Sequence, residues 1–424
     1  MVERALLVRI CKDKREQDES ISLLAELGEL VRTLGIEVVE SSLVMTRQFH
    51  RKFLCGSGKA EEMIALANAH ECDCIVFDNI FLPSQQREWE ELADLCVIDR
   101  EEVILDIFSK RAQTKEARLQ VDLAKMQYSL PRLTRMWSHL DREGGSSGGG
   151  KGGGGASRGM GEQQVEVDRR LARTRIDQCQ RELAEVRKQR DTRRKEREKQ
   201  GTPTAAIAGY TNAGKSTLLN QLSGSDVMAK DMLFATLDTT TRAIELPDGQ
   251  PLLLTDTVGF VRNLPHRLVE AFKATLEESV LADFIIHVLD ASSPEVYEFH
   301  KTTMEVLTEL GAGDKPIITL LNKIDILDDP VALAGLEAAF PNTLAINAKS
   351  GFGMSELLKK CTEMLADRVQ IKTYQIPQSR GDLSGLLHSE AKVLDTTYEG
   401  NDVVITAIVP ANIAGKLGHF IKNT

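Results

Sequence analysis

A phosphate-binding loop constrains this 424-residue chain more than any other feature of its sequence. Residues Gly209–Ser216 read G-Y-T-N-A-G-K-S and match the pattern G-x-x-x-x-G-K-[ST]. A strand-like run at Thr204–Ala208 precedes the loop and a helix-like run at Lys215–Leu222 follows it, which is the context that such a loop requires. The pattern therefore predicts an α/β domain in which backbone N–H groups surround the phosphates of a nucleotide.

Four further segments follow in the order that a guanine-nucleotide domain requires. They are Phe234-Ala235-Thr236-Leu237, Asp256-Thr257-Val258-Gly259, Asn322-Lys323-Ile324-Asp325 and Asn347-Ala348-Lys349. The last three come after strand-like runs, which are, in the same order, Leu252–Thr255, Ile317–Leu321 and Thr343–Ile346. Since open α/β sheets bind ligands at the carboxyl ends of their strands, we expect the five segments to converge on one GTP site.

The phosphate-binding loop, the segment that contains Thr236 and the segment that contains Asp256 are expected to hold the phosphates and a magnesium ion. Lys215 would reach the β- and γ-phosphates, and the N–H of Gly259 would face the γ-phosphate. Mg²⁺ would be bound by the hydroxyls of Ser216 and Thr236 and, through a water, by Asp256.

Base recognition is predicted at the last two segments. The Asp325 carboxylate can accept two N–H bonds from guanine, whereas adenine would leave this carboxylate unpaired. We expect the Ala348 N–H to donate to guanine O6 and the stem of Lys349 to pack on the base. The residues predicted to bind GTP are Gly209, Tyr210, Thr211, Asn212, Ala213, Gly214, Lys215, Ser216, Thr217, Asp256, Gly259, Asn322, Lys323, Asp325, Asn347, Ala348 and Lys349.

The sequence lacks the glutamine that orients the attacking water in Ras-like proteins, because Phe260 follows the Asp-x-x-Gly segment. We therefore expect a GTP hydrolase that is slow alone and stimulated by a partner. Asn212 could help to bind a monovalent cation such as K⁺ beside the β- and γ-phosphates, or it could simply brace the loop. Arg262 and Arg267 are interpreted as solvated residues rather than catalytic arginines. The predicted catalytic residues are Lys215, Thr236, Gly259 and Asn212.

Residues 1–108 are predicted to form an N-terminal α/β domain, because strand-like and helix-like runs alternate there. The strand-like runs are Ala5–Ile10, Ile36–Val44 and Cys74–Phe77, and the helix-like runs are 20–34, Ala60–Ala69 and Pro83–Ala93. Gly56-Ser57-Gly58-Lys59 invites a second phosphate-loop interpretation, but its spacing does not match, and a turn before the 60–69 helix is the preferred interpretation.

Residues 109–199 are predicted to form an antiparallel coiled-coil hairpin. Apolar residues recur at 4-3-4-3 spacing at Leu119, Leu123, Met126, Leu130 and Leu133, and again at Ala172, Ile176, Cys179, Leu183 and Val186. Pro131 should bend or end the first arm. Between the arms, residues 144–161 contain 11 glycines in 18 positions and are expected to form a flexible loop.

Charge is distributed unevenly along the chain. Residues 109–199 contain 23 Lys and Arg against 13 Asp and Glu, whereas the whole chain has a net charge of −10. A basic segment in an acidic protein predicts a polyanionic partner for that segment, although the same charges could also be the solvated faces of a coiled coil.

The remaining assignments concern the chain ends and the cellular compartment. Residues 200–370 are assigned to the GTP-binding domain and 371–424 to a small C-terminal α/β cap with a strand-like run at Asp402–Val409. Seven scattered cysteines argue against a disulfide framework. No secretory signal and no apolar run of about 20 residues is found. We therefore expect a cytoplasmic monomer without a membrane span, and leave open a fraction bound peripherally to membranes.

Together these residues resemble the HflX-type GTPases, relatives of the Obg group. In the catalytic domain, the resemblance rests on Asn212–Asn220, Phe234–Asp238 and Asp256–Phe260. Outside it, the resemblance rests on Phe53–Glu62, on Arg158–Glu162 and on Asp168-Arg169-Arg170. The likeness covers nearly the whole chain. One departure is Asn347, where the family usually has Ser.

The resemblance implies a factor that binds the large ribosomal subunit and splits or rescues stalled ribosomes under stress. A basic hairpin fits this expectation, because it can lie along RNA phosphates. Two alternatives remain open: an ATP-dependent RNA-remodelling enzyme that uses the N-terminal domain, and a scaffold whose hairpin binds a protein under the control of GTP.

Overall fold

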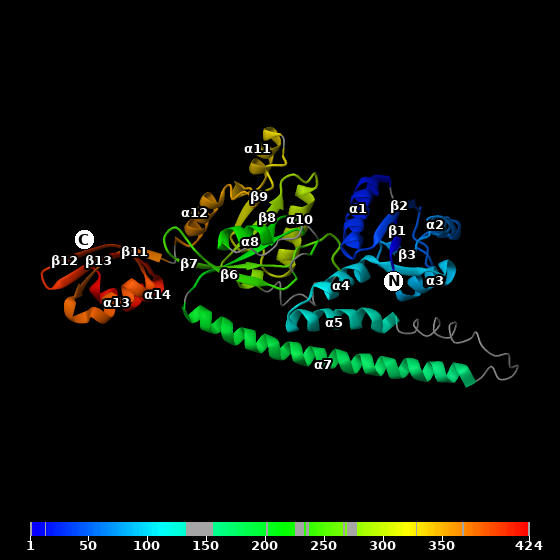
Figure 1. Cartoon of the computed structure of the whole chain (residues 1–424), viewed down its shortest axis with the longest axis horizontal. Coiled ribbons are helices and arrows are strands. Elements are labelled where there is room, and N and C mark those ends of the chain that lie inside the picture. Colours follow the sequence, from blue (N-terminus) through cyan, green and yellow to red (C-terminus); the bar gives the residue numbers. More distant parts are fainter. Residues whose placement is uncertain are drawn as a thin grey trace. The chain divides into compact units, whose positions relative to one another are not determined.

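The computed structural model describes the chain except for residues 1, 13, 133–155, 201, 225–232, 235–236, 266–267, 269–277, 328, 367–368 and 423–424. Its contacts divide the chain into two units (Figure 1). Unit 1 contains Met1–Lys188 together with the short segments Met232–Leu237 and Arg262–Phe272, and unit 2 contains the rest.

Unit 1 is built on a four-stranded parallel sheet with the order β2-β1-β3-β4. Its elements are β1 Arg4–Cys11, α1 Gln17–Thr33, β2 Glu37–Met45, α2 Ser57–Ala69, β3 Cys74–Phe77, α3 Pro83–Ala93, β4 Cys96–Asp99 and α4 Arg100–Arg111. Alternate residues of β1 face opposite sides of the sheet. Leu6, Val8 and Ile10 pack with α2 and α3 around Trp89, whereas Leu7 lies against α1. The predicted N-terminal α/β fold is thereby confirmed.

The last strand and helix of this domain were not predicted. β4 has only four residues, and α4 starts directly after it without a glycine or proline between them. Asp99 ends the strand and also caps the helix, because its side chain accepts a hydrogen bond from the Glu102 N–H. α4 then continues to Arg111 and so crosses the predicted boundary at residue 108.

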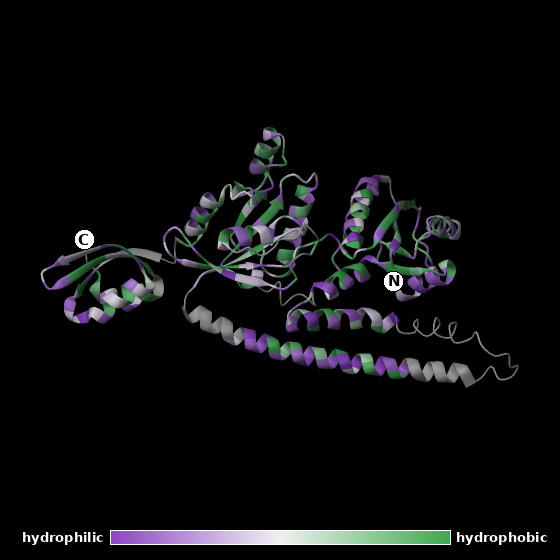
Figure 2. Ribbon diagram, viewed as in Figure 1, coloured by the Kyte–Doolittle hydropathy of each residue, from purple (hydrophilic) through white to green (hydrophobic). Residues whose placement is uncertain are grey.

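Two helices occupy the segment predicted to be a hairpin, α5 Lys115–Ser129 and α7 Ala156–Gln200. They contact each other through Leu119, Cys179 and Leu183, which form a small apolar cluster with Leu123. α5 ends at Ser129, ahead of Pro131, as expected. Figure 2 shows that the described part of α7 is mostly hydrophilic.

The predicted glycine-rich loop does not extend to residue 161. Residues 144–155 lie outside the described residues, but α7 begins at Ala156, so 156–161 are helical and not part of a loop. Only two of these six residues are glycines, and adding residues to an existing long helix costs far less than starting a new one.

Unit 2 contains a six-stranded sheet with the order β10-β9-β8-β5-β7-β6, in which only β6 is antiparallel to its neighbour. Its elements are β5 Thr204–Gly209, α8 Lys215–Ser223, β6 Thr240–Glu245, β7 Pro251–Asp256, β8 Phe284–Asp290, α10 Val296–Glu309, β9 Ile317–Asn322, α11 Pro330–Ala339, β10 Thr343–Ala345 and α12 Met354–Met364. One face packs on α8 and α12, with Ile207, Ile286, Leu218 and Leu357 in the core.

The C-terminal part of unit 2 is a three-stranded antiparallel sheet with the order β11-β13-β12. Its elements are β11 Val369–Pro377, α13 Gly381–Glu390, β12 Lys392–Glu399, β13 Asp402–Pro410 and α14 Ala411–Lys416. The helices cover one face, where Tyr374, Ile405 and Leu387 are buried. β11 begins at Val369 and so crosses the predicted boundary at residue 370, because its strand pairing starts there. None of the described helices is long and apolar enough to span a bilayer.

Candidate active site

The phosphate-binding loop joins β5 to α8 and is held in place by Asn322. Gly214 has φ +98°, and a Cβ there would lie 2.2 Å from Nδ2 of Asn322, so only glycine fits. Nδ2 of Asn322 donates to the Ala213 carbonyl (2.8 Å), and its Oδ1 accepts from the Ala348 N–H (2.9 Å). Asn322 therefore ties the phosphate loop to the predicted base-binding segment, a role that the sequence analysis did not assign.

Lys215 is buried in the loop, where its Nζ donates to the Tyr210 carbonyl (2.7 Å). Burial lowers the pKa of Lys215 to about 8, and the nearby charge of Asp256 opposes this shift. A Cβ on Gly259 would lie 2.9 Å from this Nζ. The backbone of Gly259 therefore closely approaches the ammonium group expected to bind the phosphates.

The residues predicted to hold magnesium are adjacent where the structure describes them. Ser216 Oγ donates to Asp256 Oδ2 (2.6 Å), which joins the start of α8 to the end of β7. The hydroxyl of Thr211 is buried and has no hydrogen-bond partner within the described part of the chain. A hydroxyl and a carboxylate at this position fit Mg²⁺, which prefers oxygen ligands and retains waters. Thr236 lies outside the described residues.

Phe260 occupies the position of the missing glutamine and is fixed beside the loop. Its N–H donates to the Gly209 carbonyl (3.1 Å), and its carbonyl accepts from the Thr211 N–H (2.9 Å). The side chain is 1% exposed. A buried apolar ring cannot orient a water, so the structure supplies no substitute for the glutamine at this residue.

The segments predicted to bind the base come together at the ends of β9 and β10. Lys323 has φ +63° and forms an ion pair with Asp290 (2.7 Å), at the end of β8. Asp290 was not predicted, although its place at the end of a strand-like run could have indicated it. Asp325 is exposed, as a ligand-accepting carboxylate should be.

The Ala348 N–H differs from the sequence-based expectation. It donates to Asn322 Oδ1 in this structure, so donation to guanine O6 requires that this bond be shared or exchanged when GTP binds. Asn347 braces the same loop, because its Oδ1 accepts from the N–H groups of Lys349 (3.0 Å) and Ser350 (3.1 Å). Asn212 has φ +61° and is exposed, which leaves both interpretations of this residue open.

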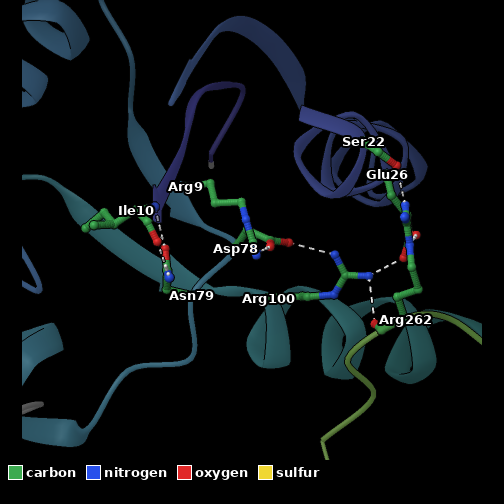
Figure 3. Close-up of polar contacts among 8 residues, drawn as sticks. All are labelled: Arg9, Ile10, Ser22, Glu26, Asp78, Asn79, Arg100 and Arg262. Carbon is green, nitrogen blue, oxygen red and sulfur yellow. Dashed lines mark hydrogen bonds and ion pairs between the residues drawn. The ribbon is translucent and has the colours of Figure 1, made fainter. Parts of the chain in front are cut away.

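Arg262 corrects one prediction, because it is buried and not solvated. It belongs to unit 1, where its Nε donates to Glu26 Oε2 (2.9 Å) and its guanidinium donates to Ser22 Oγ (2.7 Å) on α1. Arg100 of α4 donates to the Arg262 carbonyl (3.0 Å). Figure 3 shows these contacts. No local sequence pattern indicates them, because the partners are separated by more than 160 residues. Arg267 lies outside the described residues.

The same network extends to the parallel sheet of unit 1. Arg100 also pairs with Glu26 and with Asp78 (2.7 Å to Oδ1), and Asp78 is paired with Arg9 of β1 (Figure 3). Phe234, two residues before Thr236, is also in unit 1, where its ring packs edge-on against Phe108 of α4 at 4.6 Å. Residues near Thr236 and near Gly259, which are expected to contact Mg²⁺ and the γ-phosphate, therefore pack against α1 and α4.

The site combines a phosphate loop on a mostly parallel sheet, the adjacent residues Lys215, Ser216 and Asp256, and an Asn-Lys-x-Asp segment tied to the loop. These features define a P-loop GTPase, an enzyme that hydrolyses GTP. Three family models match the chain: the GTP-binding GTPase N-terminal region (residues 22–109), the GTP-binding GTPase middle region (111–197) and the 50S ribosome-binding GTPase (204–323). The chain belongs to the HflX family of GTPases, as relatives that it matches at 41–59% identity over 87–98% of their length show.

Two relatives illustrate this membership. The GTPase HflX of Akkermansia muciniphila is 59% identical over 427 residues, which covers 100% of this chain and 98% of the relative. The GTPase HflX of Escherichia coli is 41% identical over 382 residues, which covers 90% of this chain and 87% of the relative. Among solved structures, a GTP-binding protein of Sulfolobus solfataricus in complex with GDP is 23% identical to this chain, with a TM-score of 0.43. The match covers 86% of this chain and 99% of that protein's chain.

Proposed function

We propose that this GTPase binds the large ribosomal subunit through its basic hairpin and splits or rescues stalled ribosomes under stress. GTP favours docking, and hydrolysis favours release. The family model that matches residues 204–323 is described as a 50S ribosome-binding GTPase, which supports a ribosomal partner.

The exposed charge of α7 supports RNA as the surface that is bound. Arg170, Arg181 and Arg187 are all exposed on this helix. Arginines spaced along one rod can neutralise successive phosphates, and such binding needs no base sequence. Double-stranded RNA is recognised mainly through its shape and backbone, which suits a long helical arm.

The packing of Phe234 and Arg262 in unit 1 supports the proposal that GTP controls docking. Phe234 and Arg262 flank the positions expected to respond to the γ-phosphate, and both pack in unit 1. Unit 1 also contains α5 and most of α7. A change in the switches on GTP binding would therefore strain or release contacts in the unit that contains the proposed RNA-binding helices.

Magnesium and a partner complete the proposed hydrolysis. Ser216, Thr236 and, through a water, Asp256 would hold Mg²⁺, which would supply positive charge beside the transferring phosphate. Because Phe260 offers no polar group, turnover is slow until the ribosome reorganises the switch. A cation held by Asn212 is a further proposal; equal GTP turnover in potassium and in sodium at the same ionic strength would exclude it.

ATP-dependent remodelling by the N-terminal domain has less support. α2 begins at Ser57, so Gly56–Lys59 is the turn and first residues of a helix, and the Lys59 ammonium pairs with Glu62 (2.6 Å). ATP hydrolysis that survives in a Lys215→Ala protein would restore this candidate. A protein partner for the hairpin would be distinguished by binding that resists salt, since RNA binding weakens steeply with salt.

Sedimentation with isolated large ribosomal subunits tests the proposal. The full chain should sediment with the subunits in the presence of a non-hydrolysable GTP analogue and remain in solution with GDP. Deletion of residues 144–155 should weaken the binding seen with the analogue. Equal binding with both nucleotides would contradict the control of docking by GTP. Equal binding with and without the deletion would contradict a role for residues 144–155.

A further inference from the structure

Two cysteines lie side by side on neighbouring strands of the unit 1 sheet. Cys74 of β3 and Cys96 of β4 are register partners in a parallel pairing. Partners in adjacent strands point to the same face, and neighbouring strands are about 4.8 Å apart. This spacing falls within the range of about 4.4–6.8 Å between Cα atoms that a disulfide requires.

The two thiols differ in their access to solvent. Cys74 is buried, whereas Cys96 is exposed at the edge strand. Cys96 also lines a pocket of about 630 Å³ together with Glu102, Lys125 and Tyr128. A small solute can therefore reach Cys96 more readily than Cys74.

Cys96 is the more reactive of the two thiols. The Cys74 thiol donates to the Ile75 carbonyl (3.7 Å). The neighbouring Cys74 thiol lowers the pKa of Cys96, against the desolvation of the Cys96 sulfur and the charges of Glu102 and Asp106, which raise it. The thiolate is the form that attacks oxidants and disulfides.

We propose that Cys96 and Cys74 form a redox-active dithiol that hydroperoxides convert to a disulfide. The Cys96 thiolate attacks a peroxide oxygen, the O–O bond breaks, and the leaving oxygen takes up a proton, which gives a sulfenic acid on Cys96. The Cys74 sulfur then attacks the Cys96 sulfur, the S–O bond breaks, and the hydroxide leaves as water with the Cys74 proton. Hydrogen peroxide is reduced to two waters, and the pair loses two electrons and two protons.

This site is separate from the GTP site and is compatible with a reducing compartment. Cytosolic disulfides are usually transient and redox-sensing. Oxidation would join the edge strand β4 covalently to β3 beside the pocket, and a thiol reductant would reverse it.

Intact-mass analysis of the full chain treated with hydrogen peroxide tests the proposal. We expect a loss of two hydrogen atoms that dithiothreitol reverses, with a linked peptide pair containing Cys96 and the Cys72–Cys74 segment. Cys72→Ser is the matched control and should still lose two hydrogens, since Cys72 packs in the core on the opposite face of the sheet. Cys74→Ser should lose none and should instead accumulate a sulfenic acid on Cys96, trapped with dimedone.

Three results would overturn the proposal: oxygen added to Cys96 in the unmodified chain without any loss of hydrogen, a disulfide that persists in Cys74→Ser, or a disulfide that disappears in Cys72→Ser. If Cys74→Ser does not fold, fragment ions of the linked peptides from the unmodified chain still distinguish Cys72 from Cys74.

Discussion

Base choice is predicted to depend on a single carboxylate, Asp325, which is exposed at the end of the Asn-Lys-x-Asp segment. Asp325→Asn should weaken GTP binding by about tenfold to a hundredfold, since a lost hydrogen bond to a charged group costs about 1.5–3 kcal/mol. The amide can donate to xanthine O2, so xanthosine triphosphate should gain affinity. Equilibrium titration with both nucleotides measures the change.

Asp329→Asn provides the matched control for this substitution. It removes the same charge four residues away, and an asparagine can still cap α11 as Asp329 does. We expect its nucleotide preference to be unchanged. If Asp325→Asn retained full preference for GTP, Asp325 would not be the residue that reads the base.

Lys215 should couple GTP binding to proton uptake. Its pKa is about 8 in the ligand-free structure because it is buried, and the phosphates of GTP should raise this pKa. Below pH 8 Lys215 is already charged, so little uptake occurs. Above pH 8 binding takes up a proton, and affinity falls as the pH rises. Calorimetry at pH 9 in two buffers of different ionisation enthalpy should give different binding heats; identical heats would contradict this assignment.

At the scale of secondary-structure elements, β8 buries His287 beside the half-buried His300 of α10. His287 is fully buried, and neither of its ring nitrogens has a hydrogen-bond partner among the described residues. Burial, together with the nearby His300 and Lys215, lowers its pKa to about 3. The folded protein therefore keeps His287 neutral, whereas the unfolded chain binds a proton below about pH 6.5.

Stability should consequently fall as the pH drops from 6.5 toward 4, with His287 contributing up to about 1.4 kcal/mol for each pH unit. His287→Leu removes the titrating group and should flatten this part of the curve, while it raises the free energy of unfolding by removing two unsatisfied polar atoms. Urea unfolding at a series of pH values measures both effects. A variant with the same pH slope as the unmodified chain would show that other groups control it.

The elements of unit 1 are also joined by the buried ion pairs around Glu26. Glu26→Gln should lower the free energy of unfolding by about 3–5 kcal/mol, because it leaves the charges of Arg100 and Arg262 poorly compensated in the interior. Glu62→Gln removes half of an exposed pair with Lys59 and should cost less than about 1 kcal/mol. Urea unfolding of both variants measures these losses. If the two variants lost the same free energy of unfolding, the buried ion pairs would contribute no more to stability than the exposed pair.

The alternation of strands and helices, and the location of the GTP site, could be predicted because they depend on local patterns. Strand-like runs such as Ile317–Leu321 and a loop such as Gly209–Ser216 carry their signal within a few residues. The burial of Arg262 could not be predicted, because it depends on Glu26 and Arg100 from distant parts of the chain. The commitment of the Ala348 N–H to Asn322 is equally non-local.

At the scale of the whole molecule, docking on the large ribosomal subunit should depend on where positive charge lies and not on how much positive charge the chain carries. Arg170, Arg181 and Arg187 are exposed on α7, and Lys301, Lys359 and Lys416 are exposed elsewhere. Changing either trio to glutamine removes the same charge. Only the α7 trio should weaken binding to the large subunit, and it should also reduce the dependence on salt, since each lost phosphate contact lowers the slope by about 0.7–0.9.

The affinity of these two variants and of the unmodified chain for large ribosomal subunits should be measured with a GTP analogue and with GDP, across a series of salt concentrations. With the analogue, binding should be tight and salt-sensitive for the unmodified chain and the Lys trio, and weaker with a shallower salt slope for the α7 trio. With GDP, binding should be weak for all three proteins. Equal binding by both variants would show that the charge of α7 does not control docking, and equal binding with both nucleotides would show that GTP does not.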